Sequence, residues 1–232
     1  DIWNPETDRH IPLTYGVSTL DRKFENKKAL RQRFWLQDAF KPIVCYIGRL
    51  DHQKGVPLIT HAIHYSLHHG CQFVLLGTAA DGRIGHHFWD LKRQYNNNPH
   101  CHLELGFNEE LSHLIYAGAD MIIVPSLFEP CGLTQLIGLK YGTVPIVRNT
   151  GGLADTVFDA NHADKPYEER NGYVFNDFNA PGIESALHRA IGMWYSYPQH
   201  FRELMANGMR CGYSWNHPGQ DYLNVYELIR DK

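Results

Sequence analysis

Short apolar runs alternate with longer amphipathic segments along the chain. Apolar spacing of three and four residues predicts a helix over residues 56–69, with Val56, Ile59 and Ile63 on one face, and another over residues 109–117. Strands separated by helices of this length need crossover connections, which favour a parallel sheet covered on both faces. The pattern therefore predicts an α/β fold, a Rossmann-like lobe with a mostly parallel six-stranded sheet flanked by helices. The six predicted strands, rich in β-branched and other apolar residues, are residues 43–47, 72–76, 101–105, 121–124, 144–148 and 173–175.

Composition narrows the class of protein. The 232 residues, 43% of them hydrophobic, are enough to bury one ordinary core, either as a single domain or as one lobe of a larger enzyme. A net charge of -3 offers no basic surface, so we expect neither nucleic acid nor an anionic membrane as a partner. The sequence shows no apolar run of transmembrane length and no signal or transit peptide. The five cysteines are odd in number and scattered, which favours a reducing compartment over a disulfide framework.

Parallel α/β sheets bind ligands beyond the carboxyl ends of their strands, and the first loop there is GRLDHQKG, at residues 48–55. This loop lacks the glycine pattern of dinucleotide-binding folds and the lysine pattern of phosphate-binding P-loops. It carries Arg49 and Lys54 instead, a planar guanidinium fork and a point charge that together suit a diphosphate. The alternative is that both side chains are solvated loop cations or members of surface ion pairs.

A second loop, SLFEPCGLTQ, follows the strand predicted at residues 121–124. A proline disfavours a helical conformation at Glu129, Gly132 lets the backbone approach a ligand, and a helix is predicted to begin near Leu133. The free N–H groups of that helix start would bind an anion if the turn faces the same cleft as the two cations. Alternatively, Glu129 merely complements the helix dipole, and Cys131 is an ordinary buried thiol.

A third loop, LGFNEE, contains Phe107 before the predicted helix cap Asn108. The usual packing partner of a residue at that position would be Ser112, which is not apolar. Phe107 therefore either stacks on a nucleobase or packs into the core.

A row of histidines, His61, His64 and His68, recurs on one helical face. This face lies opposite the apolar stripe, and the sequence places no carboxylate or thiol set beside it. No metal site is expected.

The ordered motifs of the chain resemble the carboxyl-terminal half of bacterial glycogen synthases and plastid starch synthases, especially the cyanobacterial enzymes and the plant branch akin to them. The motifs that carry the resemblance are GRLDHQKG, FVLLG, HLIYAGADMIIVPSLFEPCGLTQL, KYGTVPIVRNTGGLADTV and YSWN. Members of this family are retaining glycosyltransferases of two Rossmann-like lobes, the GT-B architecture. They transfer glucose from ADP-glucose to the non-reducing 4-hydroxyl of an α-1,4-glucan.

The resemblance implies a donor site built from the three loops. Arg49 and Lys54 would grip the diphosphate and stabilise the departing ADP, and Phe107 would hold the adenine-stacking position. Glu129 and Cys131 would line the glucosyl pocket. Main-chain donors to the sugar or the distal phosphate would come from Gly132, Leu133 and Thr134.

Two features bear on the implied chemistry. Many related two-lobed transferases have a second glutamate where this chain has Ile137, which puts a carboxylate contact to the ribose in doubt, although glycogen and starch synthases commonly lack that glutamate too. Retention favours front-face attack, in which the leaving phosphate takes the acceptor's proton, over a double displacement with Glu129 as nucleophile, because no partner carboxylate is evident. ADP-glucose is then a substrate, no cofactor or metal is expected, and the location is a bacterial cytoplasm or a plastid stroma.

The resemblance also implies a missing amino-terminal lobe with its own Lys-x-Gly-Gly-Leu loop. We expect a hinge-proximal leader at residues 1–25, the nucleotide-sugar-binding domain at 26–210, and a helix at 211–232 that crosses back to the absent lobe. The isolated lobe should bind ADP weakly and synthesise nothing. The alternatives are a non-catalytic module that binds nucleotide or glucan, and an oxidoreductase lobe, which would need the glycine fingerprint that residues 48–55 lack.

Overall fold

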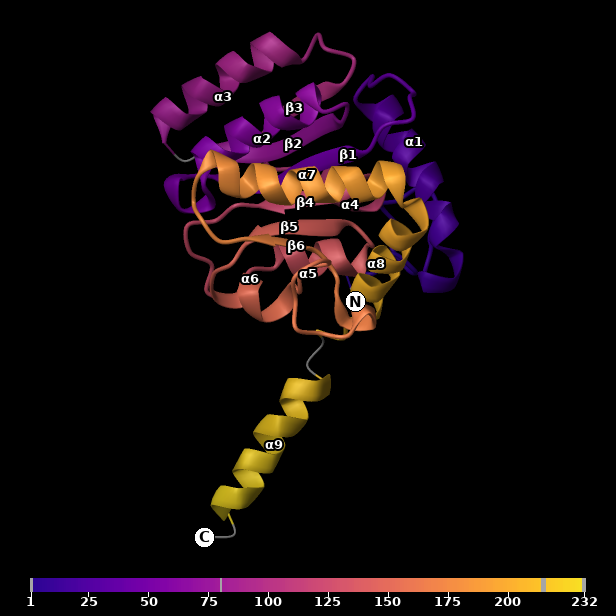
Figure 1. Cartoon of the computed structure of the whole chain (residues 1–232), viewed down its shortest axis with the longest axis vertical. Coiled ribbons are helices and arrows are strands. Elements are labelled where there is room, and N and C mark those ends of the chain that lie inside the picture. The colour runs from indigo at the N-terminus through magenta and orange to yellow at the C-terminus, as the bar shows by residue number, and fades with distance from the viewer. Residues whose placement is uncertain (1, 80, 214–215, 231–232) are drawn as a thin grey trace.

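The computed structural model describes residues 2–79, 81–213 and 216–230. Its centre is one six-stranded sheet with the order β3-β2-β1-β4-β5-β6, in which every neighbouring pair runs parallel (Figure 1). The predicted Rossmann-like α/β fold is confirmed. The strands are β1 (Ile43–Leu50), β2 (Gln72–Ala79), β3 (Cys101–Leu105), β4 (Met121–Val124), β5 (Val144–Arg148) and β6 (Tyr173–Phe175).

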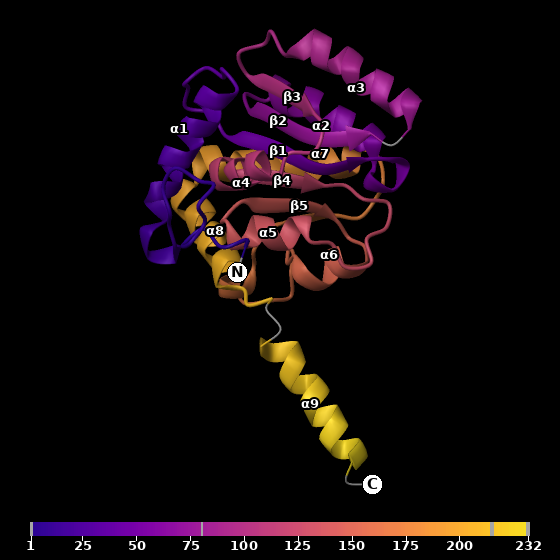
Figure 2. The same cartoon turned by 180° about the vertical axis from the view of Figure 1, so that it is seen from behind.

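Helices cover both faces of the sheet. In Figure 1 α7 and α2 lie in front of the sheet, and in Figure 2 α4 and α5 lie in front of its other face, with α1 beside them. The α-helices are α1 (Lys23–Arg33), α2 (Val56–His68), α3 (Gly82–Tyr95), α4 (Glu109–Gly118), α5 (Thr134–Lys140), α6 (Gly151–Thr156), α7 (Ala180–Ser196), α8 (Pro198–Arg210) and α9 (Asn216–Arg230). Three short 3-10 helices are η1 (Val17–Arg22), η2 (His52–Lys54) and η3 (Tyr167–Glu169).

The strand interiors bury both of their faces, as a covered parallel sheet requires. Along β1, Val44 and Tyr46 belong to the core shared with α2 and α7, whereas Ile43 and Cys45 belong to the core shared with α1 and α4. Because strand side chains alternate, one run of apolar residues serves two cores. This explains why the strands read as continuous apolar runs in the sequence.

The predicted elements match the observed ones closely. The strands at 101–105, 121–124, 144–148 and 173–175 have the predicted bounds, and β1 and β2 each continue three residues further than predicted. The Asn108 side chain caps α4 by accepting a hydrogen bond from Leu111 N at 2.9 Å, as predicted. Gly138 lies so close to β4 that an added Cβ would be 3.0 Å from Ile122 Cγ2, so α5 packs closely on the sheet at this position.

The segment before α1 is part of the globular body. Its side chains Ile11, Tyr15 and Leu20 are buried in the core on the α4 side of the sheet. The Tyr15 hydroxyl donates to the carbonyl of Tyr141 at 2.7 Å, and the Tyr141 hydroxyl donates to Asp8 at 2.6 Å. Residues 2–22 therefore add their own packing to that face.

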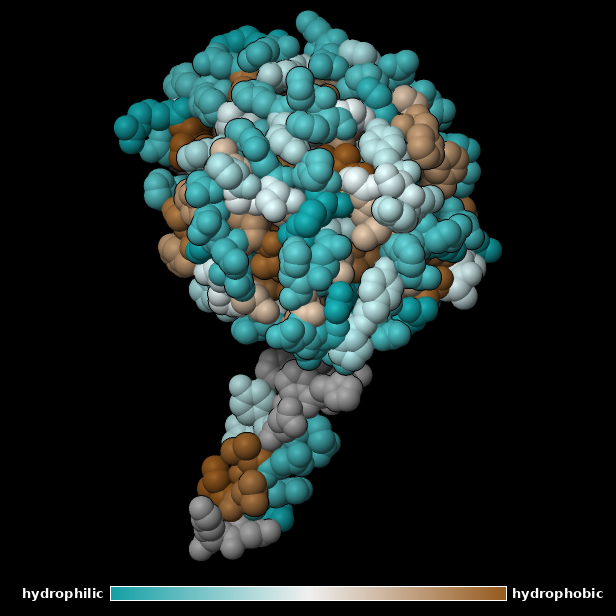
Figure 3. Space-filling view, in the orientation of Figure 1, coloured by the Kyte–Doolittle hydropathy of each residue, from teal (hydrophilic) through white to brown (hydrophobic). Residues whose placement is uncertain are grey.

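Helix α9 stands apart from the globular body (Figure 1). Tyr222, Tyr226 and Ile229, the face predicted to contact an absent lobe, are all more than half exposed. Figure 3 shows hydrophobic side chains gathered on this helix, where the exposed aliphatic residues are Leu223, Val225, Leu228 and Ile229. Two residues of the YSWN motif, Ser214 and Trp215, lie outside the described residues, as do the last two residues of the helix predicted at 211–232. Contact with another lobe stays a prediction.

Candidate functional site

The loops after β1 and β4 meet where the strand order reverses. The β1–β4 ladder contains only the pairs Val44 with Met121 and Cys45 with Ile122, so the two strands part well before β1 ends. A reversal of strand order in a parallel sheet opens a crevice beyond the carboxyl ends of the strands. The predicted site residues lie in the loops around this crevice.

The β1 loop is bent onto the β4 loop by η2. Asp51 caps η2 by accepting a hydrogen bond from Lys54 N at 3.0 Å. Gly55 follows with a φ of 78°, and a Cβ there would be 2.2 Å from the carbonyl oxygen of Pro125. Only glycine accepts both this conformation and this close approach. The bend brings Lys54 against the loop that carries Glu129.

Lys54 Nζ forms an ion pair with Glu129 Oε2, and the Ser126 hydroxyl donates to the same oxygen at 3.0 Å. Glu129 is only 8% exposed, so its charge is held largely out of water and relies on these two partners. Glu129 precedes α5 and pairs with a cation from another loop. The alternative of a first-turn acid that merely complements the helix dipole is therefore wrong.

Arg49 takes a different position from Lys54. Its guanidinium pairs with Asp51 at 2.9 Å and its side chain is 64% exposed. The Tyr46 hydroxyl donates to the main-chain carbonyl of Arg49, and burial raises the pKa of this hydroxyl, which keeps it a donor. The backbone of Arg49 is thus fixed, while its charged end is open to solvent and to an incoming anion.

Two side chains that sequence reasoning missed hold the β4 loop in place. Gln53 Nε2 donates to Phe128 O at 3.2 Å. Arg148, at the end of β5, donates through Nε to Ser126 O at 2.9 Å and through Nη2 to Leu127 O. A guanidinium that occupies successive main-chain carbonyls fixes the path of the loop. The sequence signal for Arg148 was a basic residue at a strand end, within one of the motifs that carry the family resemblance.

The paired glycines of NTGGLADT have a local role that the sequence did not reveal. Gly152 N donates to Glu129 O at 2.9 Å, and a Cβ on Gly152 would be 2.1 Å from Cys131 O. Gly151 has a φ of 45°, and a Cβ there would be 2.3 Å from Glu129 O. The start of α6 therefore lies directly on the backbone of the Glu129 loop.

The turn into α5 presents unpaired main-chain donors. Within the described residues, the N–H groups of Gly132, Leu133 and Thr134 have no hydrogen-bond acceptor. Gly132 has a φ of 77°, which only glycine adopts readily. The Cys131 side chain is exposed, so the interpretation of Cys131 as a buried thiol is wrong. The Gln135 amide supports the turn by donating to Cys131 O at 3.0 Å.

A pocket of about 360 Å³ opens beside this turn, at the carboxyl ends of β1, β2 and β3. Phe107 lines it and is 86% exposed, so the alternative of core packing for Phe107 is wrong. Arg49 lies at the same pocket, and so does Ile137 of α5, where a polar contact to a ribose was already in doubt. Trp3 also lines the pocket; sequence reasoning did not single it out.

The pocket combines features that suit a ligand with a flat ring system and a negatively charged group attached to it. Its lining is mostly apolar around an exposed phenyl ring, with one guanidinium at the rim. Apolar lining with few polar groups is typical of small-molecule sites. Burial raises the pKa of the Tyr116 hydroxyl at its base. Arg49 and Phe107 thus share one pocket, and Lys54, Glu129 and the α5 turn share a cluster next to it.

Within the described part of the chain, no group of three or more His, Cys, Asp or Glu side chains could hold a metal ion. One carboxylate that the sequence did not place there lies beside the histidine row: His61 Nε2 is 2.6 Å from Glu184 Oε1. Glu184 belongs to α7, which packs beside α2, and this contact across about 120 residues had no local signal in the sequence.

None of the helices described has both the length and the apolar character that a bilayer crossing requires.

Comparisons with known proteins agree with this geometry. Residues 29–203 match the family model described as "Glycosyl transferases group 1". The chain is 65% identical over 230 residues to glycogen synthase 1 of Nitrosococcus oceani, covering 99% of this chain and 47% of that protein. It is 60% identical to glycogen synthase 1 of Trichormus variabilis, again over 47% of that protein.

A solved structure gives the same result. The catalytic domain of starch synthase IV from Arabidopsis thaliana, bound to ADP and acarbose, superposes with a TM-score of 0.95 at 39% identity. The alignment covers 99% of this chain and 47% of that one. The resemblance to one half of glycogen and starch synthases is confirmed, and the chain spans about half the length of the curated relatives it matches.

Proposed function

Because this chain belongs to the group 1 glycosyl transferases, we propose that it is the donor-binding, carboxyl-terminal lobe of a glycogen or starch synthase. With an amino-terminal lobe it would transfer glucose, with retention, from ADP-glucose to the non-reducing 4-hydroxyl of an α-1,4-glucan. The observation that carries the proposal is the meeting of the two loops. Lys54 pairs with Glu129 next to a nucleoside-sized pocket that holds Arg49 and Phe107.

In this proposal the nucleoside enters the pocket with its base on Phe107. The diphosphate then reaches Arg49, Lys54 and the unpaired N–H groups at the start of α5. Charge-assisted hydrogen bonds from a guanidinium and an ammonium are the strong type for phosphate oxygens. The glucosyl unit lies next to Glu129 and Cys131, where a carboxylate stabilises sugar hydroxyls or positive charge that develops at the anomeric carbon.

Glu129 is a stabilising group and not the nucleophile in this proposal. Its Oε2 already accepts hydrogen bonds from Lys54 and Ser126, which lowers its availability for attack. A retaining double displacement also needs a second carboxyl group about 5 Å away. The carboxylate of the neighbouring β1 loop, Asp51, is already engaged with Arg49 and with the N–H of Lys54. Front-face attack remains, with the leaving phosphate of ADP accepting the acceptor's proton while Arg49 and Lys54 balance its charge.

Nucleotide binding is the first test. Isothermal titration of this chain with ADP should give weak but measurable heat, and UDP should bind less well because its smaller base covers less of Phe107. Phe107→Ala should weaken ADP binding about tenfold, the loss expected for one aromatic contact. Trp35→Ala is the matched control, since Trp35 is 80% exposed and outside the pocket. Equal affinity for ADP and UDP, unchanged by Phe107→Ala, would contradict the proposed donor site.

Turnover is the second test. In a two-lobed enzyme that contains this chain, Arg49→Ala and Lys54→Ala should each lower kcat about 10²- to 10³-fold, as does removal of one preorganised stabilising group. Lys28→Ala is the control, because Lys28 is an exposed cation of α1 whose ion pair is with Glu25. Incorporation of radiolabelled glucose into glycogen measures the effect, and the isolated lobe should incorporate none. Full turnover in both variants would rule out their role with departing ADP.

A further inference from the structure

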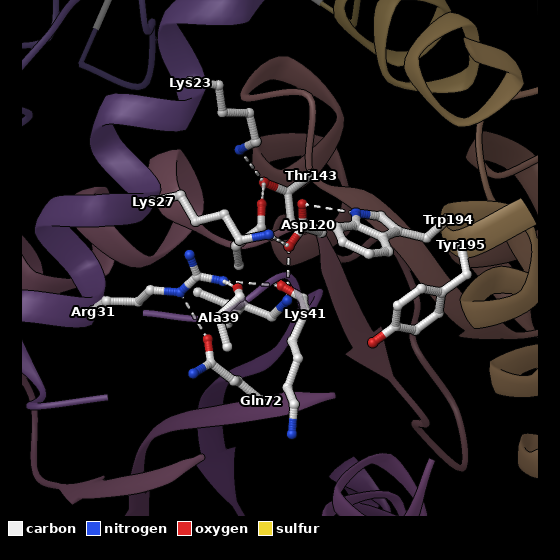
Figure 4. A network of polar contacts seen from close by, with 12 residues as sticks. Lys23, Lys27, Arg31, Ala39, Lys41, Gln72, Asp120, Thr143, Trp194 and Tyr195 are labelled. Carbon is white, nitrogen blue, oxygen red and sulfur yellow. Dashed lines mark hydrogen bonds and ion pairs between the residues drawn. The ribbon is translucent and has the colours of Figure 1, made fainter. Parts of the chain in front are cut away.

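A second pocket lies at the amino ends of the strands, on the side of the sheet opposite to the candidate donor site. Its volume is about 470 Å³, and its lining comes from α1, the segment at 38–41, α7 and α8. Asp120 marks its place: the carboxylate accepts a hydrogen bond from Ile43 N at 2.7 Å, at the amino end of β1 (Figure 4). Since β1 has eight residues and rises about 3.3 Å per residue, the two ends of this strand are about 26 Å apart.

Most of the charged side chains that line this pocket already have partners. Arg202 donates two hydrogen bonds to Asp21, and a guanidinium has five donors, so Arg202 has donors left for a ligand. Arg31 also donates to Gln72 and to the carbonyls of Ala39 and Lys41. Lys41 is the one lining cation without an ion-pair or hydrogen-bond partner for its amine among the described residues, and its side chain extends away from the network in Figure 4. The three pairs are Lys27 with Asp120 at 2.7 Å, Arg31 with Asp38 at 3.0 Å and Arg202 with Asp21 at 2.6 Å.

Two aromatic rings that line the pocket, Phe40 and Trp194, form a group with Tyr195, which lies beside them. Phe40 is 79% exposed and Tyr195 is 38% exposed, and Trp194 lies between them. The ring of Trp194 is 4.9 Å from that of Phe40 and 4.8 Å from that of Tyr195. The indole N–H of Trp194 donates to Asp120 at 3.2 Å, which fixes the ring against the charged network (Figure 4). Exposed aromatic groups of this kind mark binding surfaces more often than single exposed rings do.

This combination fits a neutral polyhydroxylated ligand better than an anion. An anion would find little unpaired positive charge, because all the lining cations except Lys41 are already occupied. Sugar hydroxyls can share the remaining donors of Arg202 and the carboxylate oxygens of Asp21 without breaking that pair. The apolar faces of the sugar rings can lie on Phe40 and Tyr195.

We propose that the pocket and the aromatic group of Phe40, Trp194 and Tyr195 bind a segment of an α-1,4-glucan, at a site separate from the donor crevice. The choice of glucan rests on the proposed function, because a transferase that extends a polymer meets that polymer as acceptor. A contact at the amino ends of the strands would hold the polymer to the enzyme while its chain ends exchange at the crevice. Two linked contacts raise the effective concentration of the second without any new interaction there.

The test uses the chain as described, with glycogen and maltoheptaose as probes. Native electrophoresis in gels that contain glycogen should retard the wild-type chain. Phe40→Ala together with Tyr195→Ala should weaken this binding about tenfold, as expected when an aromatic contact is lost. Trp35→Ala should leave retardation unchanged, because Trp35 is as exposed as Phe40 to within 1% and lies outside the pocket. Thermal melting followed by circular dichroism checks that the double variant is folded.

A second measurement does not depend on any variant at the aromatic rings. Titration of maltoheptaose into ¹⁵N-labelled wild-type chain should move the indole N–H signal of Trp194, assigned by its absence from Trp194→Phe. Inorganic phosphate should not move it. No retardation by glycogen, retardation that survives the double substitution, or a Trp194 signal that responds to phosphate and not to maltoheptaose would each overturn the proposal.

These outcomes are separable from a failure of the donor site. If ADP binds and glycogen does not, the proposed function stands and the glucan site is wrong. If glycogen binding depends on Phe40 and Tyr195 but ADP does not bind, the glucan site stands and the donor role of this chain is wrong.

Discussion

Lys54 and Glu129 are 75 positions apart in the chain, and their ion pair joins the two loops of the candidate site. Breaking a buried ion pair by removing one partner costs about 3–5 kcal/mol, and a partly exposed pair such as this one costs less. Lys54 retains 20% side-chain exposure, so water can reach it and an incoming anion can compete for it. Glu129 is more enclosed than Lys54. If an anion drew Lys54 away, Glu129 would keep the hydrogen bond from Ser126 as its remaining side-chain partner.

The contact between Gly152 and the Glu129 loop gives a test of the local packing. Gly152→Ala should lower the free energy of unfolding by about 1–3 kcal/mol, the usual cost of overpacking, because its Cβ would be 2.1 Å from Cys131 O. ADP affinity should fall as well, since the loop must move. Gly192→Ala is the control: this exposed helix position has nothing within 4 Å of an added Cβ. It should stabilise the chain by about 0.5–1 kcal/mol.

Urea unfolding measures both glycine variants. A stable Gly152→Ala chain with unchanged ADP binding would show that α6 does not position the Glu129 loop.

Residue-level prediction succeeded where the cause was local. The Asn108 cap follows from a few neighbouring residues. The exposure of Cys131 and the approach of His61 to Glu184 depend on how distant elements pack, and neither has a signal in the flanking sequence. The roles of Phe107, Glu129 and the other site residues remain proposals.

Strands β1 and β2 illustrate why element ends are harder to predict than element centres. Both continue past their apolar runs because Gly48 pairs with Gly77 and Leu50 with Ala79 in the same ladder. The backbone N–H and C=O groups at the carboxyl end of each strand thus find their hydrogen-bond partners on the other strand. A sequence pattern shows burial, and it does not show this mutual pairing.

The Asp159 carboxylate connects β6 to α7, and its titration should make the free energy of unfolding depend on pH. Asp159 accepts hydrogen bonds from Arg189 at 2.7 Å and from Val174 N at 2.7 Å. Burial alone would raise the pKa of Asp159, but these hydrogen bonds outweigh burial and lower it. The unfolded chain, with an aspartate pKa of about 3.9, then binds the proton more readily than the folded chain. The stabilisation is therefore complete above about pH 4 and is lost as the pH falls through the lowered value.

Asp159→Asn should accordingly cost about 1–3 kcal/mol at pH 7, and the difference from wild type should shrink below about pH 4. Urea unfolding at several pH values measures it. Asp90→Asn serves as the control, because Asp90 is an exposed side chain of α3 whose ion pair is with Arg93. A difference that stays constant down to pH 3 would show that the charge of Asp159 is unimportant to the connection between β6 and α7.

At the scale of the entire chain, α9 should be dispensable for the stability of the globular body. Deletion of residues 214–232 should change the melting temperature by less than about 2 °C, because Leu223, Val225, Leu228 and Ile229 are more than half exposed. Removing these aliphatic side chains should also reduce self-association, measured by light scattering. A fall of about 5 °C or more would mean that α9 packs on the body in solution.

The fold was predictable almost completely, and the site only in part. Buried parallel strands leave a strong periodic signal, and all six were recognised. The three loops were found because ligands of such sheets bind at strand ends. Trp3, Gln53 and Arg148 were missed, because a motif does not show which of its side chains reach a distant loop or pocket.

The narrow seam between β1 and β4 has a thermodynamic consequence. Residues 43–105 build one side of the sheet and residues 121–175 the other, and only two residue pairs of backbone ladder join them. A ligand that binds Arg49 on one side and the turn at Gly132 on the other would link the two sides of the sheet. Because such a ligand binds only the folded chain, its binding free energy adds to the free energy of unfolding. Both sides should then unfold together, at a higher melting temperature than without the ligand.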